Sequence, residues 1–153
     1  MNPIIQKFIT MMVPVAQKVQ ATWRVPTSVC IAQAALETGW GRSIVGNNYF
    51  GIKASTAGIP AVSAPTMEFE NGKWISVIAS FSRYDSLSQC ADAYGKFLND
   101  NERYAPCFQF CDEPLLFTEA LQKAGYATDP SYAEKLNAII TTYNLLNYET
   151  IKS

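Results

Sequence analysis

The dipeptide Asn71-Gly72 places the strongest single constraint on how this chain can fold. Asn-Gly is the preferred centre of a two-residue type I′ turn, because both of its residues tolerate a positive φ. Alternating runs typical of β-strands flank it at 66–70 and 73–81. The sequence therefore predicts an antiparallel β-hairpin with a defined register.

The register of this hairpin decides which side chains share a face. Counting outward from the turn pairs Glu70 with Lys73. Because side chains alternate along a strand, Met67 and Phe69 fall on one face and Glu68 and Glu70 on the other. We expect an apolar face that packs and an acidic face that borders a cleft.

The remaining segments are mostly helical in pattern. Apolar residues recur at intervals of three or four positions. The helices expected from this spacing cover residues 3–22, 28–38, 86–98, 114–124 and 130–143. Between and around them we expect a kink or break near Pro14, a surface excursion over 54–65, a loop over 99–113, and a frayed tail from 144.

Composition narrows the class of protein. A length of 153 residues, with 48% hydrophobic and 16% charged residues, predicts one folded domain over residues 1–153. A net charge of −1 provides no basic field, which argues against sequence-independent binding to nucleic acid. The chain contains no histidine, so it has neither a Ser-His-Asp nor a Cys-His centre and lacks the usual zinc ligand. We expect no metal and no cofactor.

Four cysteines are present. Cys30 and Cys90 fall on apolar helix faces, where a buried free thiol is the usual state. Cys107 and Cys111 are close enough in sequence to bridge locally, and their redox state stays open. No apolar run has the length of a membrane span, so we expect no membrane insertion. The apolar segment after Lys7 resembles a signal peptide, but its helical spacing favours a first core helix, so we expect no conventional export signal.

Glu37 is the most informative single acid in the sequence. It lies in the last turn of a helix that Gly39 should end. The negative end of the helix dipole and the apolar neighbours both disfavour an ionised carboxyl group, and hence raise its pKa. A carboxyl group that stays protonated near neutral pH can serve as the general acid in glycoside cleavage. The alternative is a surface glutamate near a helix end.

Several motifs occur together in one order: AQAALETGWGRS at 32–43, NNYFGIK at 47–53, TMEFENG at 66–72, NERY at 101–104 and AGYATDP at 124–130. This combination resembles the bacterial endo-β-N-acetylglucosaminidases of glycoside hydrolase family 73. The family includes flagellar rod-associated peptidoglycan hydrolases and many autolysins. The resemblance covers roughly residues 26–143. It implies an α+β, mostly helical, lysozyme-like fold, with the hairpin beside the active-site cleft.

The resemblance also assigns roles to individual residues. Glu37 would be the general acid, and Glu68 of the hairpin motif would be the base or stabilising carboxylate. Glu70, in the same motif and on the same face, is the competitor for that role and is otherwise expected in substrate binding. Tyr126 matches the tyrosine placed near the catalytic centre of the family.

The loop after the acid is expected to line the glycan groove. Asn48 and Tyr49 match it as substrate-binding residues. Phe50 is expected in the core, and Trp40 is expected to pack behind Glu37. Tyr104 follows the Arg-Tyr pair of the family, and we expect it to be structural.

The mechanism stays open at this level. A carboxyl separation of about 6.5–9.5 Å would predict inversion and one of about 5–5.5 Å retention. Glu68 would be dispensable if the acetamido group of the substrate were the nucleophile. It could also reach the substrate only after the hairpin moves.

The expected function is hydrolysis of the β-1,4 bond after N-acetylglucosamine in peptidoglycan. The alternatives are a muramidase or a lytic transglycosylase of the same superfamily, and a non-catalytic glycan-binding module. The chain would act at the cell wall, in the periplasm or outside the cell. No separate wall-binding domain is expected, which suits a phage lysin or a secreted antibacterial effector delivered by a non-classical route. An effector would have an immunity protein that occludes the cleft.

Overall fold

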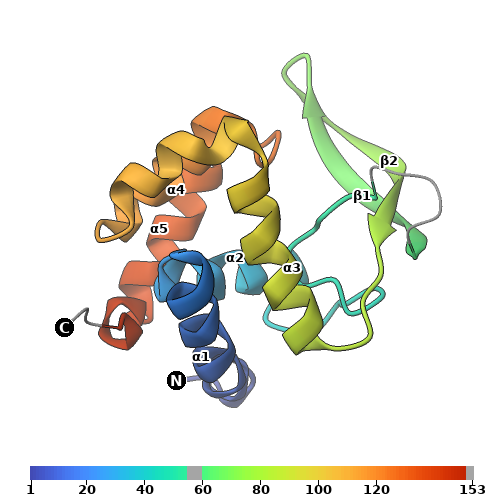
Figure 1. Cartoon of the computed structure of the whole chain (residues 1–153). Helices are drawn as coiled ribbons and strands as arrows, with labels where there is room; N and C mark the ends of the chain where they lie inside the picture. The colour runs from blue at the N-terminus through green and yellow to red at the C-terminus, as the bar shows by residue number, and fades with distance from the viewer. Residues whose placement is uncertain (55–59, 151–153) are drawn as a thin grey trace.

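A body of helices carries a single hairpin on one side (Figure 1). The computed structural model describes residues 1–54 and 60–150. Its elements in chain order are α1 (Pro3–Trp23), α2 (Thr27–Thr38), β1 (Ala61–Glu70), β2 (Lys73–Ser82), α3 (Leu87–Asp100), the 3-10 helix η1 (Glu102–Phe110), α4 (Pro114–Ala124), α5 (Tyr132–Thr142) and the 3-10 helix η2 (Leu145–Tyr148). The predicted class, mostly helical with one small hairpin, is confirmed.

Helix α2 lies at the centre of the body. Ten of its twelve residues are buried. It packs against α1, α4, α5 and η2, so other helices surround it along most of its length. Burial on all sides explains why the helix is apolar around most of its circumference and shows no clear polar stripe. Only its C-terminal end, with Glu37, reaches the cleft.

The hairpin has the predicted register and turn. Glu70 pairs with Lys73 and Glu68 with Ile75. Asn71 and Gly72 have φ values of 50° and 76°, as a type I′ turn requires. The strands are longer than predicted, because β1 begins at Ala61 inside the expected surface excursion. The part of that excursion at 55–59 lies outside the described residues.

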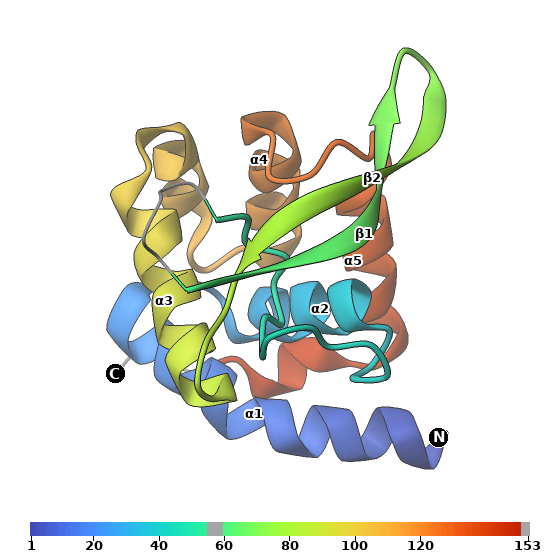
Figure 2. The same cartoon turned by 90° about the vertical axis from the view of Figure 1, so that its right-hand side faces the viewer.

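The apolar face of the hairpin does not pack as expected. Met67, Trp74 and Ile78 are 54%, 47% and 72% exposed. The hairpin runs beside the helical body (Figure 2), and on this face Trp74 lies against the ammonium group of Lys135, 5.5 Å from its ring centroid. Ala64 on the opposite face is buried. The prediction failed because strand alternation separates two faces but does not show which one meets the body.

The base of the hairpin is tied to the loop that follows α2. The backbone N–H of Ser82 donates to the carbonyl of Ile52, and that of Ala54 donates to Ser80, both at 2.9 Å. These two bonds form an antiparallel bridge between Lys53 and Phe81. The segment 52–54 therefore extends the sheet at its base and leaves the turn end further from the body.

The structure differs from three expectations about the helices. α1 continues through Pro14, so the helix is not divided there. The expected loop at 99–113 contains η1, whose Tyr104 and Cys107 are buried. The tail does not fray at 144: η2 buries Leu145, and the carboxylate of Glu149 accepts hydrogen bonds from the backbone N–H groups of Thr27 and Ser28 at 2.9 Å. Long-range contacts order these segments, and local patterns do not reveal them.

Two further findings concern the class of protein. All four cysteines are free thiols, and Cys30, Cys90 and Cys107 are buried. No helix within residues 1–54 and 60–150 combines the length and apolarity needed to cross a bilayer.

Candidate active site

Glu37 is held at the point where α2 ends. Gly39 adopts the left-handed conformation, with φ at 58°, and its N–H bonds to the carbonyl of Ala35. The hydroxyl of Thr38 donates to the carbonyl of Ala34 at 2.7 Å and accepts from the N–H of Gly41 at 2.8 Å. These contacts fix the last turn of the helix and the chain that leaves it. The predicted helix end is confirmed.

The carboxyl group of Glu37 lies against the backbone of Gly51. A Cβ atom at position 51 would stand 2.6 Å from the carboxyl carbon of Glu37, and Gly51 has a φ of 67°. Both the space and the backbone conformation therefore require glycine here. Beyond this contact the carboxyl group opens into a pocket of about 160 Å³, which also includes Ser43 of the loop and Thr66 of β1.

The environment of Glu37 favours its protonated form. The side chain keeps access to solvent along the cleft, but the protein removes water from its other sides, and this burial raises the pKa of the carboxyl group. Repulsion from Glu68 raises the pKa further, while the positive charge of Lys53 acts in the opposite direction. The net direction, upward, agrees with the predicted protonated acid.

Asn48 is buried, and its amide is fully used inside the protein. The NH₂ group donates to the carbonyls of Ile52 and Ser82 at 2.8 Å. Its oxygen accepts from the N–H groups of Phe50 and Ile52 at 3.3 and 3.2 Å. Asn48 lines the pocket next to Glu37, and at the same time it joins the loop to the end of β2.

The two aromatic residues after Asn48 point into the core. Tyr49 is 8% exposed, and its backbone N–H donates to the sulfur of Cys90. Phe50 stacks on Tyr94 with ring centroids 3.9 Å apart, which confirms its predicted core position. The structure therefore places Tyr49 beneath the loop and not on its surface.

Tyr126 is partly buried and connects the α4–α5 loop to the acid. Its hydroxyl donates to the carbonyl of Phe50 at 2.7 Å, next to Gly51. Its ring stacks on Tyr132 at 5.8 Å. Burial raises the pKa of Tyr126 well above the usual value, and the nearby charge of Glu37 adds to the effect. The neutral phenol therefore fixes the loop on which the carboxyl group of Glu37 rests.

Glu68 occupies the inward face of β1, as predicted, and both of its oxygens have partners. Lys53 Nζ lies 2.5 Å from Oε1, and the hydroxyl of Thr128 donates to Oε2 at 2.8 Å. Burial tends to raise the pKa of Glu68, but the hydrogen bonds from Lys53 and Thr128 and the charge of Lys53 outweigh it, so the pKa is lowered. Glu68 is thus held as a carboxylate.

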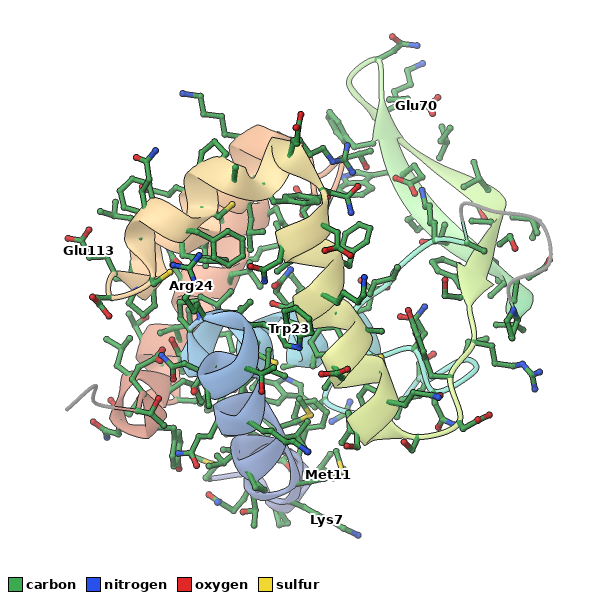
Figure 3. The ribbon with its side chains drawn as sticks, viewed as in Figure 1. Lys7, Met11, Trp23, Arg24, Glu70 and Glu113 are labelled. Carbon is green, nitrogen blue, oxygen red and sulfur yellow. The ribbon has the colours of Figure 1, made fainter. Side chains whose placement is uncertain are left out.

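Lys53 and Thr128 were not among the predicted site residues. Both lie inside the recognised motifs, NNYFGIK and AGYATDP, and this was the signal that could have identified them. Glu70 lies near the turn of the hairpin and is exposed, away from the helical body (Figure 3). Trp40 packs edge to face against Phe8 and Tyr143, as expected of a residue behind Glu37.

The remaining chemistry of the site is that of carboxyl, hydroxyl and amide groups. Within the described part of the chain, no cluster of three or more acidic or cysteine side chains is arranged to hold a metal ion. The arrangement brings together one carboxyl group with a raised pKa and one with a lowered pKa, on different elements. Such a pair suits acid–base chemistry at a single bond.

A family model described as mannosyl-glycoprotein endo-β-N-acetylglucosaminidase matches residues 13–145. The chain belongs to the glucosaminidase family. This confirms the family resemblance inferred from the motifs, and Glu37, Glu68 and Tyr126 all lie within the matched glucosaminidase region.

Curated relatives and a solved structure support the assignment. The chain is 42% identical over 141 residues to the peptidoglycan hydrolase FlgJ of Pseudomonas aeruginosa, which covers 87% of this chain and 35% of FlgJ. It is 34% identical over 154 residues to the exo-glucosaminidase LytG of Bacillus subtilis, and this match covers 95% of this chain and 54% of LytG. It therefore spans about a third to a half of these curated relatives. The crystal structure of a peptidoglycan hydrolase mutant from Sphingomonas sp. A1 is similar, with a TM-score of 0.83 and 37% identity. The match covers 94% of this chain and 97% of that one.

Proposed function

We propose that this chain is a glycoside hydrolase that cleaves the β-1,4 bond after N-acetylglucosamine in peptidoglycan. The observation that carries the proposal is the pair of carboxyl groups on α2 and β1, whose pKa values are shifted in opposite directions. Membership of the glucosaminidase family and the named peptidoglycan hydrolases among the relatives support the choice of substrate.

In this mechanism Glu37 donates its proton to the glycosidic oxygen as the bond to the anomeric carbon breaks. Glu68, as a carboxylate, stabilises the developing positive charge or takes a proton from the water that adds to the anomeric carbon. The net reaction consumes one water molecule and leaves N-acetylglucosamine at the new reducing end. Tyr126 is a positioning residue, because its hydroxyl holds the loop that supports Glu37.

We propose different parts in binding for the three other predicted site residues. Asn48 and Tyr49 shape the groove from inside the protein, because their polar groups and rings are committed to the loop and the core. Glu70 lies further toward the turn of the hairpin, on the same face as Glu68. It would contact sugar units of the glycan chain beyond the cleaved bond.

The test is digestion of purified peptidoglycan by wild type and Glu37→Gln, followed by borohydride reduction and mass spectrometry. Reduced N-acetylglucosamine ends from wild type alone would support the proposed bond and the proposed acid together. Reduced muramic acid ends would identify a muramidase. Binding of the glycan without cleavage by wild type would favour a binding module.

A lytic transglycosylase is the second candidate, and one observation favours it. Both oxygens of Glu68 are engaged by Lys53 and Thr128, which leaves less capacity for activating water. A transglycosylase needs one acid and no water, because the substrate forms an anhydro ring. Anhydro-muramic ends in the same digestion would identify this reaction.

The setting is also a proposal. We propose action at the bacterial cell wall, either as a phage lysin or as a secreted antibacterial effector. An effector would be inhibited by an immunity protein that covers the Glu37 cleft. Expression of the chain in the periplasm should then be toxic unless the Glu37 carboxyl is removed, and absence of toxicity from an active enzyme would argue against the effector setting.

A further inference from the structure

The position of Glu68 depends on contacts that the hairpin itself does not provide. In a two-residue hairpin the pair flanking the turn is hydrogen-bonded and the next pair is not. The next pair here is Phe69 with Trp74, so the N–H of Phe69 points away from β2. That N–H donates to the hydroxyl oxygen of Thr128 at 3.0 Å. The same hydroxyl donates to Oε2 of Glu68.

Thr128 therefore holds both the backbone and the carboxylate of the strand that carries Glu68. It belongs to the α4–α5 loop, two residues after Tyr126, whose hydroxyl fixes the carbonyl of Phe50. Lys53 holds the other oxygen of Glu68 and lies two residues after Gly51, which contacts Glu37. Two short segments, 50–53 and 126–128, which the Tyr126–Phe50 hydrogen bond joins, thus connect the surroundings of the two carboxyl groups.

We propose that Thr128 and Lys53 form a clamp that positions Glu68 for the reaction and fixes the hairpin across the cleft. This inference rests on the proposed function, and it adds two positioning residues that act through Glu68. Neither residue is required to touch the reacting bond. The α4–α5 loop, which carries both Tyr126 and Thr128, would then help to position both carboxyl groups, those of Glu37 and Glu68.

Lys53 carries a charge and Thr128 does not, so their effects on the two carboxyl groups can be measured separately. Lys53 lowers the pKa of Glu68 and also that of Glu37, whereas Thr128 acts on Glu68 alone. The charged groups around Glu68 are Lys53 from the loop, Glu37 from α2, Glu70 and Lys73 along the hairpin, and Asp129, which is paired with Lys135.

The test compares Thr128→Val with Thr141→Val, a matched control whose exposed hydroxyl bonds only within α5. Thr128→Val should lower kcat about tenfold, the loss expected for one charge-assisted hydrogen bond, with a smaller change in KM. In the pH–activity profile of this variant, the acid limb, which Glu68 sets, should move to higher pH because Glu68 then protonates more easily. The alkaline limb, which Glu37 sets, should stay unchanged. Thr128→Ser keeps the hydroxyl and should restore activity and the acid limb.

The second arm compares Lys53→Met with Lys96→Met, which breaks a surface ion pair to Asp100 in α3. Lys53→Met should also lower kcat about tenfold, for the same reason. Unlike Thr128→Val, it should move both limbs to higher pH, because Lys53 lowers the pKa of both carboxyl groups.

Two further measurements on these variants do not depend on enzyme activity. Amide exchange at Phe69, followed by NMR, should be faster in Thr128→Val than in wild type and unchanged in Lys53→Met. Carboxyl NMR should show a higher pKa for Glu68 in both variants.

The possible outcomes separate the clamp from the proposed function. If Glu37→Gln is inactive but Thr128→Val and Lys53→Met behave like their controls, the clamp is wrong and the function stands. If Thr128→Val is more active than wild type, the contact inhibits, and the clamp is also wrong. If Glu37→Gln keeps full activity, Glu37 is not the acid and the proposed mechanism fails, and the NMR readouts alone decide whether the contacts hold Glu68.

Discussion

The two carboxyl groups of the site are carried by very different structures. Glu37 ends a helix of which ten of twelve residues are buried, whereas Glu68 lies on a strand of which one residue in ten is buried. Hydrophobic burial places the first, and a few polar contacts place the second. Because a single hydrogen bond contributes only about 0.5–1.5 kcal/mol net, the position of Glu68 is far easier to change than that of Glu37.

This difference suits the separate parts that the proposed mechanism gives to the two groups. A proton donor must meet the glycosidic oxygen in a fixed geometry, and the packing of α2 against four other elements would provide that for Glu37. If the hairpin moves when a long polymer binds, it must let the polymer enter first. The exposed outer face of the hairpin is consistent with this, since no packed layer holds it down.

The largest effect expected is that of Glu37→Gln. The amide keeps the shape of the side chain but has no acidic proton to donate, so kcat/KM should fall about a thousandfold. Reducing-end release from peptidoglycan measures it. The control is Glu113→Gln, at an exposed glutamate on the far side of the helical body (Figure 3). A loss of less than tenfold in Glu37→Gln would show that the acid lies elsewhere.

The next effect is that of Gly51→Ala, compared with Gly39→Ala. Both glycines have a positive φ, so each substitution should lower the free energy of unfolding by about 1–3 kcal/mol. Only the Cβ at 51 meets the Glu37 carboxyl group, while nothing lies within 4 Å of one at 39. We expect activity to fall about tenfold or more only in Gly51→Ala, since a small displacement of an acid is costly. Equal activities in the two folded variants would contradict the contact.

A smaller effect is expected on the pH profile of Glu68→Gln. Glu37 must be protonated, so activity falls as pH rises through its raised pKa; Glu68 must be ionised, so activity falls as pH drops through its lowered pKa. Removing the charge of Glu68 removes one cause of the raised pKa of Glu37. The acid limb should disappear and the alkaline limb should move to lower pH. An unchanged alkaline limb would show that the two carboxyl groups do not interact.

The parts of this site that the sequence predicted are those with local causes. The end of α2 follows from Gly39, and the pairing of Glu68 follows from the Asn71-Gly72 turn, because both depend on a few neighbouring residues. Family motifs identified Tyr126, but only the structure shows that its hydroxyl holds the carbonyl of Phe50.

The parts that the sequence did not predict depend on residues far apart in the chain. Lys53 and Thr128 meet Glu68 across separations of 15 and 60 residues. Glu149 meets Ser28 across 121 residues. Such pairs are determined by how elements pack, and no periodicity of one segment reveals them. The exposed outer face of the hairpin has the same origin.

The smallest effect tests whether α2 is as firmly held as the comparison requires. Glu149 accepts from the N–H groups of Thr27 and Ser28 and from the hydroxyl of Ser28, at the positive end of α2. Glu149→Gln should lower the free energy of unfolding by about 1 kcal/mol, the size typical of a lost helix cap. Glu113→Gln is the matched control, because Glu113 begins α4 without a side-chain capping bond.

Denaturant unfolding measures the stability of both variants, and peptidoglycan digestion measures their activity. The helix that carries Glu37 is packed on all sides, so loss of one cap at its far end should leave kcat within about twofold of wild type. A large fall in kcat with little loss of stability would contradict the comparison. It would mean that the tail after η2 sets the position of the acid, and that α2 adjusts to polar contacts as readily as the hairpin does.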